Sequence, residues 1–256
     1  MNERTRDAVK EAMSKVPELT LVFWIIKTLA TTLGETGGDA VSMSMNLGYL
    51  LSTAIFAAIF VGAVAIQIRA PRFHPVIYWM TIVASTTVGT TLADFATRSL
   101  GIGYTGGSAI LLALLLTSLF VWKHTMGSVS VVDVCSPRSE FFYWLTITFS
   151  QTLGTALGDW TADTADLGYL GAAAIFGGLL VLVMAAYFLT RISRTTLFWA
   201  AFVLTRPLGA VVGDFLDKPI AQGGLALSRY TATAILGVLI LALVLLLPHR
   251  AARRNH

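Results

Sequence analysis

Four aspartates recur at one position of a repeated pattern: Asp39, Asp94, Asp159 and Asp214. Each lies five residues after a glycine and fifteen after a tryptophan, which is about 22 Å along a helix. A carboxylate within a membrane helix usually faces the protein interior or water, often as part of an ion site or a proton relay. We therefore expect the four carboxylates to form a shared metal site near the outer face of a membrane.

Further oxygen atoms accompany these aspartates. Glu35 stands one turn before Asp39, and threonines crowd the same stretches. The hydroxyls expected to support the site belong to Thr31, Thr32, Thr87, Thr90, Thr152 and Thr155. Oxygen donors of this kind suit hard cations such as Mg²⁺, Mn²⁺, Ca²⁺ or Na⁺. No histidine falls in an expected span, so paired histidines for haem or a soft metal are not indicated.

The same residues have structural interpretations, which stay open at this point. An aspartate at the end of a helix can cap the backbone as the chain turns into a loop, and it can also form interhelical hydrogen bonds without an ion. Threonine is common in membrane helices because it packs them together.

Two basic residues at membrane depth break the symmetry of the pattern. Lys27 has only Ile82, Ile147 and Phe202 at the equivalent positions. Arg206 stands one turn inward of the Glu35 level and can reach it if the first and last repeats are neighbours. We expect an Arg206–Glu35 pair that closes a conduit below the aspartates, with Lys27 as a second positive barrier. The alternative is a static ion pair that fixes helix register while Lys27 extends toward the interface.

The elements that must position these residues are four copies of one hairpin. Trp24, Trp79, Trp144 and Trp199 each precede a glycine by ten residues, and the copies are spaced by 55, 65 and 55 residues. The segments KTLATTLGETGGD, FWAAFVLTRPLGA and YWLTITFSQTLGTALGD resemble an uncharacterised family of small bacterial polytopic proteins, loosely described as membrane-anchored, with repeated Gly-x-x-x-[Gly/Ala]-Asp hairpins. The resemblance implies no established activity.

Two repeated features predict how the hairpins are held. The four tryptophans lie early in their spans, where aromatic belts anchor helices at the membrane interface. Small residues four apart predict close helix packing near a central axis. These pairs are Gly34/Gly38, Gly89/Ala93, Gly154/Gly158 and Gly209/Gly213.

Composition indicates the class of protein. Of 256 residues, 55% are hydrophobic and 12% charged, and the mean hydropathy is +0.74. Soluble domains carry about 25% charged residues, so a soluble enzyme or a nucleic-acid-binding protein is not indicated. The single Cys135 excludes a disulfide framework within the chain. We expect an integral membrane protein.

Eight stretches are long enough to cross a bilayer at about 20 residues each. Four carry no charge: Leu47–Ile68, Ile102–Trp122, Leu167–Thr190 and Tyr230–Leu247. Four are rich in threonine and glycine: Leu19–Gly38, Pro75–Ala93, Phe141–Gly158 and Thr195–Gly213. The expected fold is therefore all-α, with eight transmembrane helices as four parallel two-helix repeats around an axis along the membrane normal.

Thirteen of the eighteen basic residues fall on the side of the termini, which predicts a multi-pass protein of the plasma (inner) membrane with both termini cytoplasmic. The expected units are a cytoplasmic segment 1–17, repeats at 18–70, 73–124, 138–190 and 193–248, a cytoplasmic linker 125–137 and a basic tail 249–256. The stretch Met1–Lys15 reads as an amphipathic surface helix or as a disordered segment.

These observations predict a transporter or channel for a small inorganic cation, most simply a divalent ion of the Mn or Mg type. The cation would be its substrate, and no other cofactor is expected. The lipid bilayer is the expected surrounding, nucleic acid is not a partner, and a homo-oligomer is open. No nucleophile elbow, phosphate-binding loop or HExxH motif is present, so an enzyme is not predicted. The alternative is a non-catalytic packing, assembly or regulatory protein in which the aspartates are helix caps.

Overall fold

The chain is a bundle of long helices arranged in two shells. The computed structural model describes residues 14–165 and 167–252, and within them it contains no β-strand apart from one isolated bridge between Pro17 and Ala251. The inner helices are α2 (Leu21–Asp39), α4 (Pro75–Asp94), α6 (Pro137–Asp159) and α8 (Arg194–Asp217). The outer helices are α3 (Gly48–Arg69), α5 (Gly103–Met126), α7 (Gly168–Leu189) and α9 (Arg229–Leu246).

Short elements join these helices. Five-residue π-helical segments follow the first three inner helices: η1 (Ala40–Ser44), η2 (Phe95–Ser99) and η4 (Trp160–Thr164). Two 3₁₀ turns are η3 (Val131–Asp133) and η5 (Ile220–Gln222). The repeated glycine before or at the start of each outer helix has a positive φ, a conformation that residues with a Cβ rarely adopt. These glycines are Gly48, Gly103, Gly168 and Gly223, with φ between +62° at Gly168 and +84° at Gly223.

The inner helices begin at clear local signals. Thr20, Ser136 and Ser193 each accept a hydrogen bond from a backbone N–H in the first turn of the following helix. Pro75 and Pro137 occupy first-turn positions, where the missing N–H has no helical partner to lose. These signals fix where each inner helix starts.

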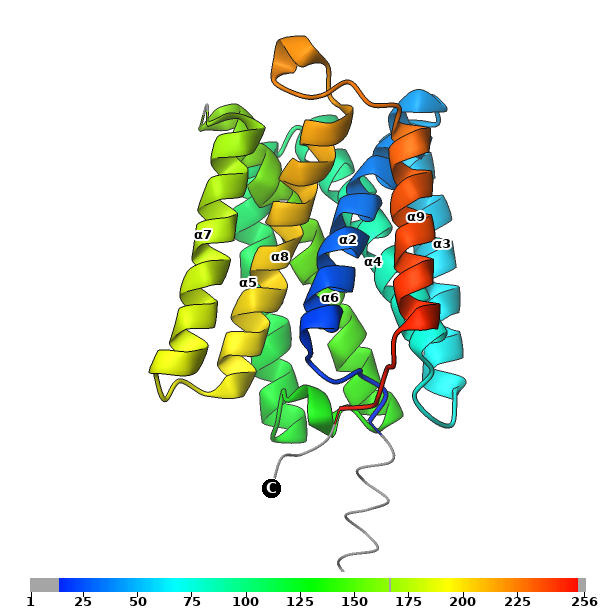
Figure 1. Ribbon diagram of the computed structural model, residues 1–256, viewed down its shortest axis with the longest axis vertical. Coiled ribbons are helices and arrows are strands. Elements are labelled where there is room, and N and C mark those ends of the chain that lie inside the picture. The colour runs from blue at the N-terminus through cyan, green and yellow to red at the C-terminus, as the bar shows by residue number, and fades with distance from the viewer. Residues whose placement is uncertain (1–13, 166, 253–256) are drawn as a thin grey trace, which may run out of the picture.

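The four inner helices form a closed ring in the order α2, α4, α6, α8 and back to α2. Each outer helix packs along the inner helix of the next repeat: α3 on α4, α5 on α6, α7 on α8 and α9 on α2 (Figure 1). The expectation that the small-residue helices are central and the uncharged helices peripheral is therefore confirmed.

Glycine allows the inner helices to approach one another. A Cβ on Gly34 would collide with the Thr86 side chain of the next repeat, and a Cβ on Gly209 would collide with Thr31. The other two repeats show the same relation, between Gly89 and Gln151 and between Gly154 and Arg206. In each repeat, this glycine therefore lies in close contact with a side chain of the next repeat, and the fourth repeat contacts the first.

The outer shell has the character of a lipid-facing surface. Leu50, Phe120, Phe188 and Leu246 are 63%, 72%, 75% and 81% exposed. In the described residues six helices are long and apolar enough to cross a membrane: α3, the segment Pro75–Ser99, α5, α7, α8 and α9. α2 and α6 carry too many polar residues to qualify alone, although they lie between α4 and α8 in the ring.

The described ends of the chain meet at one end of the bundle, which we call the termini end (Figure 1). There the Ala252 N–H donates to the Val16 carbonyl, and the Lys15 N–H donates to the Val134 carbonyl in the connection between α5 and α6. The surface helix or disordered segment expected at Met1–Lys15 lies almost wholly outside the described residues, as does the end of the basic tail after residue 252.

Candidate functional site

The axis of the ring is lined by five layers of equivalent residues, spaced four apart on each inner helix. Almost all of these side chains are less than 5% exposed. From the termini end, the layers are Phe23/Tyr78/Tyr143/Phe198, Lys27/Ile82/Ile147/Phe202, Thr31/Thr86/Gln151/Arg206, Glu35/Thr90/Thr155/Ala210 and Asp39/Asp94/Asp159/Asp214. The axis therefore changes from aromatic to polar to acidic along its length.

Two basic residues divide the four aspartates into two pairs. Arg98 binds Asp94 at 2.9 Å and Asp159 at 3.1 Å, whereas Lys218 binds Asp39 at 2.6 Å and Asp214 at 3.0 Å. The aspartates thus meet at one end of the bundle, which we call the aspartate end. They meet as ion pairs between neighbouring repeats and not as one fourfold ligand set.

The capping interpretation of the aspartates does not match this geometry. The side chains of Asp39, Asp94 and Asp159 make no capping hydrogen bond to the π-helical segments that follow them. Asp214 lies within α8, three residues before that helix ends.

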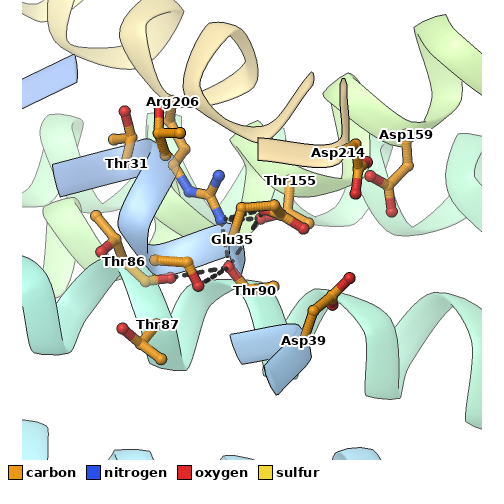
Figure 2. A network of polar contacts seen from close by, with 12 residues as sticks. Thr31, Glu35, Asp39, Thr86, Thr87, Thr90, Thr155, Asp159, Arg206 and Asp214 are labelled. Atoms are coloured by element: carbon orange, nitrogen blue, oxygen red, sulfur yellow. Dashed lines mark hydrogen bonds and ion pairs between the residues drawn. The ribbon is translucent and has the colours of Figure 1, made fainter. Parts of the chain in front are cut away.

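Arg206 and Glu35 form the contact expected from the sequence. Arg206 Nη2 lies 3.0 Å from Glu35 Oε2 and donates to the hydroxyls of Thr90 and Thr155 (Figure 2). Arg206 is fully buried and Glu35 is 2% exposed. One guanidinium therefore joins side chains from all four repeats at the centre of the ring.

Carboxyl groups outnumber their basic partners at this end. Glu35, Asp39, Asp94, Asp159, Asp214 and Asp217 share Arg98, Arg206, Lys218 and Arg229. Because buried like charges repel strongly, six carboxylates with four cations leave two negative charges that protons or a metal ion can offset.

Two groups of three buried carboxyl groups could hold an ion, and they share Asp214: one adds Asp39 and Asp217, and the other adds Glu35 and Asp159. One oxygen each of Glu35, Asp159 and Asp214 lie within 4.8 Å of one another, and all three residues are buried. Figure 2 shows the carboxyl groups of Asp159 and Asp214 side by side, next to the Arg206 network. Asp159 Oδ1 is buried and has no hydrogen-bond partner among the described residues. We call Glu35, Asp159 and Asp214 the carboxylate cluster.

Lys218 lies just beyond the end of α8 and remains charged in this setting. Burial opposes its charge, but Asp214, Asp39 and Asp217 outweigh that effect and raise the pKa of the ammonium above its usual value. Lys218 is therefore a fixed counter-ion of the aspartate end.

The other residues expected at the site divide into two groups. Thr31, Thr90 and Thr155 lie in the axial layers beside the Arg206–Glu35 pair. Thr32, Thr87 and Thr152 donate instead to carbonyl oxygens of their own helices, so their hydroxyls do not join the cluster. Lys27 is fully buried, two layers away from Glu35.

Arg98 and Lys218 are the site residues that sequence reasoning missed. Both stand four residues after a repeated aspartate, where the other two repeats have Met43 and Asp163. Because residues four apart meet on one helix face, this spacing could have identified them as aspartate partners. Their position at the ends of the inner helices, next to the expected outer loops, does not by itself distinguish an aspartate partner from a loop charge.

Three of the four repeated tryptophans are buried at the opposite end of the bundle, which corrects the expectation that they anchor the membrane interface, whereas Trp24 is partly exposed. Trp79, Trp144 and Trp199 are 1%, 2% and 6% exposed. Each indole packs on an aromatic ring of the preceding repeat, as Trp144 does on Tyr78 with centroids 5.7 Å apart. The rings fill space inside the bundle and pack on one another, and the indole N–H groups of Trp79 and Trp144 have no hydrogen-bond partner among the described residues.

Further contacts seal the termini end. The hydroxyls of Tyr78 and Tyr143 lie 2.6 Å apart. Lys15 pairs with Glu140 at 2.7 Å and donates to the carbonyls of Gln67 and Ile68. Aromatic rings therefore fill the centre here, and Lys15 ties the chain before α2 to the start of α6 and the end of α3.

Comparison with known proteins identifies the repeats. Neither a curated protein nor a solved structure matches the chain. One family model matches it four times, at residues 22–73, 77–128, 142–193 and 197–252, with the same spacing as the four tryptophans. These matches cover most of the chain, which therefore belongs to the family described as a repeat of unknown function, DUF347.

Proposed function

We propose that the protein is a membrane transporter or channel for a small inorganic cation, which binds at the carboxylate cluster. The observation that carries this proposal is the group of three buried carboxyl oxygens within 4.8 Å of one another, from Glu35, Asp159 and Asp214. Hard cations are held by such oxygens, and a cation here would offset the surplus negative charge. Mn²⁺ and Mg²⁺ are the ions that this chemistry favours.

The proposal includes a membrane around the outer shell. Exposed leucine and phenylalanine side chains on α3, α5, α7 and α9 support lipid contact on all sides of the bundle. α2 and α6 would cross the membrane inside this shell, where protein satisfies their polar side chains, so that eight helices span it. The basic residues then give a plasma-membrane protein with the termini end in the cytoplasm and the aspartate end outside.

A flux experiment tests the function. Purified protein in liposomes is assayed for uptake of Mn²⁺, Mg²⁺ and Na⁺, beside the variant Asp159→Asn and the control Asp163→Asn. Asp163 is exposed and lies four residues further along the chain. We expect the wild type and Asp163→Asn to transport a cation, and Asp159→Asn to lose at least tenfold because a carboxylate ligand is gone.

The alternative is a packing, assembly or regulatory protein in which the ion pairs only join repeats. It is supported by the way Arg98 and Lys218 engage all four aspartates. Folded wild-type protein that transports none of the three cations would favour it.

The topology has its own test. Cys135 is the single cysteine, so Cys135→Ser gives a background for labelling. A cysteine at position 163 should react with a membrane-impermeant reagent only from outside the cell, and reaction only from the cytoplasm would contradict the orientation.

A further inference from the structure

Lys27 is a buried cation without an anionic partner. Its side chain is fully buried, and Nζ lies 3.4 Å from Thr205 Oγ1 and 4.2 Å from the centre of the Phe202 ring. No carboxylate of the described residues lies within ion-pair distance of it. The equivalent positions of the other repeats are Ile82, Ile147 and Phe202, so the layer is otherwise apolar.

The charged and titratable groups around Lys27 do not compensate its charge. On α8, Arg206 lies one turn toward the aspartate end and repels a second cation. On α4 and α6, the nearest titratable groups are the phenols of Tyr78 and Tyr143, one layer toward the termini end. On α2 itself, Glu35 is eight residues away, about 12 Å, and is already paired with Arg206. A lysine in such a place can lose its proton, whereas an arginine cannot.

A groove in the side of the bundle is lined by Thr205, the residue that accepts the hydrogen bond from Lys27. The groove has a volume of about 840 Å³ and lies between α2, α7, α8 and the connection that includes Val131. Its lining includes Trp24, Thr28 and Thr205. Thr205 therefore borders the groove and accepts the hydrogen bond from Lys27 Nζ. In contrast, the axis itself is filled at the termini end by the aromatic layer.

We propose that Lys27 is the proton-exchange site of this protein and that it exchanges protons with water in the groove past Thr205. On release, an N–H bond of the ammonium breaks and its proton goes to the Thr205 oxygen, while the electron pair stays on Nζ as a neutral amine. The Thr205 hydroxyl, which donates to the Phe202 carbonyl at 2.8 Å, turns away from it and gives its own proton to a water molecule in the groove. Uptake is the reverse. This proposal rests on the cation function proposed above, because it makes the protein a proton-coupled cation transporter.

The distance between the two sites gives the expected strength of coupling. Two unit charges about 12 Å apart in a medium of effective dielectric constant about 20 change each other's binding about tenfold. A divalent cation at the carboxylate cluster and a proton on Lys27 should therefore weaken each other about a hundredfold. Cation binding releases the proton, and protonation releases the cation.

Mn²⁺ binding to the purified protein at several pH values tests this coupling. We expect wild-type affinity to rise with pH, by up to about a hundredfold. Lys27→Met, which never carries the charge, should bind more tightly than the wild type at low pH and keep only the pH dependence that protons on the carboxylates impose. Lys27→Arg, which always carries the charge, should bind more weakly than the wild type at high pH. Gel filtration and thermal melting check that each variant is folded.

The outcomes separate the two proposals. Wild-type protein that binds no Mn²⁺, Mg²⁺ or Na⁺ overturns the proposed function. If Lys27→Met binds Mn²⁺ with the same affinity and the same pH dependence as the wild type, the role of Lys27 is overturned and the cation site stays intact.

A labelling experiment tests the route without any cation. In a Cys135→Ser background, Lys27→Cys should react with a small charged thiosulfonate added from the termini side, and adding Thr205→Leu should slow the reaction at least tenfold. Ala201→Cys serves as the positive control because Ala201 lines the groove. A position 27 cysteine that stays unlabelled while position 201 reacts overturns the route, as does labelling that Thr205→Leu does not slow.

Discussion

The two ends of the bundle are closed by different chemistry in the same repeated framework. At the termini end, each repeat contributes an indole and a second aromatic ring, and these rings pack on the rings of the neighbouring repeats. At the aspartate end, each repeat contributes one carboxylate, and two basic residues join them in pairs.

This difference indicates which end can open. Separating packed aromatic rings exposes apolar surface and requires the helices to repack. The basic partners at the aspartate end, Arg98 and Lys218, have side chains that are 33% and 11% exposed, so water, a proton or another cation can take the place of a partner there. We therefore expect cations to enter at the aspartate end and the aromatic end to stay closed along the axis.

The largest loss of stability should come from Gly209→Val, which disturbs the close packing of the inner helices on which both ends depend. The added side chain would collide with Thr31 of the neighbouring helix, where a close backbone approach leaves no space. We expect a loss of about 3 kcal/mol or more in the free energy of unfolding, or no folded protein at all. Unfolding in mixed detergent micelles, followed by tryptophan fluorescence, measures it.

Gly177→Val is the matched control for that substitution. Nothing lies within 4 Å of a Cβ built at Gly177 on the outer face of α7. If both variants lose the same stability, close approach at Gly209 is not the reason for the repeated glycine.

The second prediction concerns the stability provided by the Arg206–Glu35 pair, which lies between the two ends of the bundle. Arg206→Met removes the only charge that joins Glu35 to Thr90 and Thr155 in the described structure, and leaves Glu35 buried without its counter-ion. We expect a loss of about 3–5 kcal/mol, with partial recovery in the double variant Arg206→Met/Glu35→Gln. If the pair acts as a gate instead, Arg206→Met should stay as stable as the wild type and leak cations.

Sequence reasoning succeeded for the framework because the repeats carry the same residues at the same spacing. The tryptophan, glycine and aspartate positions predict parallel hairpins, and closing the ring brings the first and last repeats together, so Arg206 meets Glu35. A small-residue pair can serve close packing or a hinge, and the contacts that a Cβ would make at Gly34, Gly89, Gly154 and Gly209 show close packing here.

The same reasoning failed where the outcome depends on which way a side chain turns. Trp79 can face lipid or the interior from the same height on a helix, and only its packing on Phe23 decides between them. Arg98 and Lys218 stand at loop boundaries, and their function as aspartate partners depends on how the π-helical turn and the end of α8 direct them inward. Local spacing does not determine those directions.

A third prediction sharpens the account of the aspartate end. Arg98→Met should free Asp94 and Asp159 from their shared partner, so Mn²⁺ binding should tighten several-fold. Because Arg98 is 33% exposed but both carboxylates are only 2% exposed, the stability should fall by about 1–3 kcal/mol, less than for Arg206→Met. Isothermal titration with Mn²⁺ measures the affinity, and the exposed Arg191→Met is the control. Weaker binding would mean that Arg98 positions the carboxylates instead of competing for them.

The smallest effect should come from the aromatic end. Tyr78→Phe removes one partner of the 2.6 Å contact with Tyr143 and leaves the ring packing intact. We expect a loss of about 1 kcal/mol and no change in cation binding. A double-mutant cycle with Tyr143→Phe isolates the hydrogen bond, and altered Mn²⁺ affinity in Tyr78→Phe would show that the two ends do not act separately.

The central claim is that a cation binds among Glu35, Asp159 and Asp214, and anomalous diffraction from crystals grown with Mn²⁺ tests it most directly. We predict a peak about 2.0–2.6 Å from an oxygen of each residue, the range of hard divalent cations, which disappears in Asp159→Asn. Peaks only at exposed carboxylates such as Asp163, with none among these three side chains, would contradict the claim.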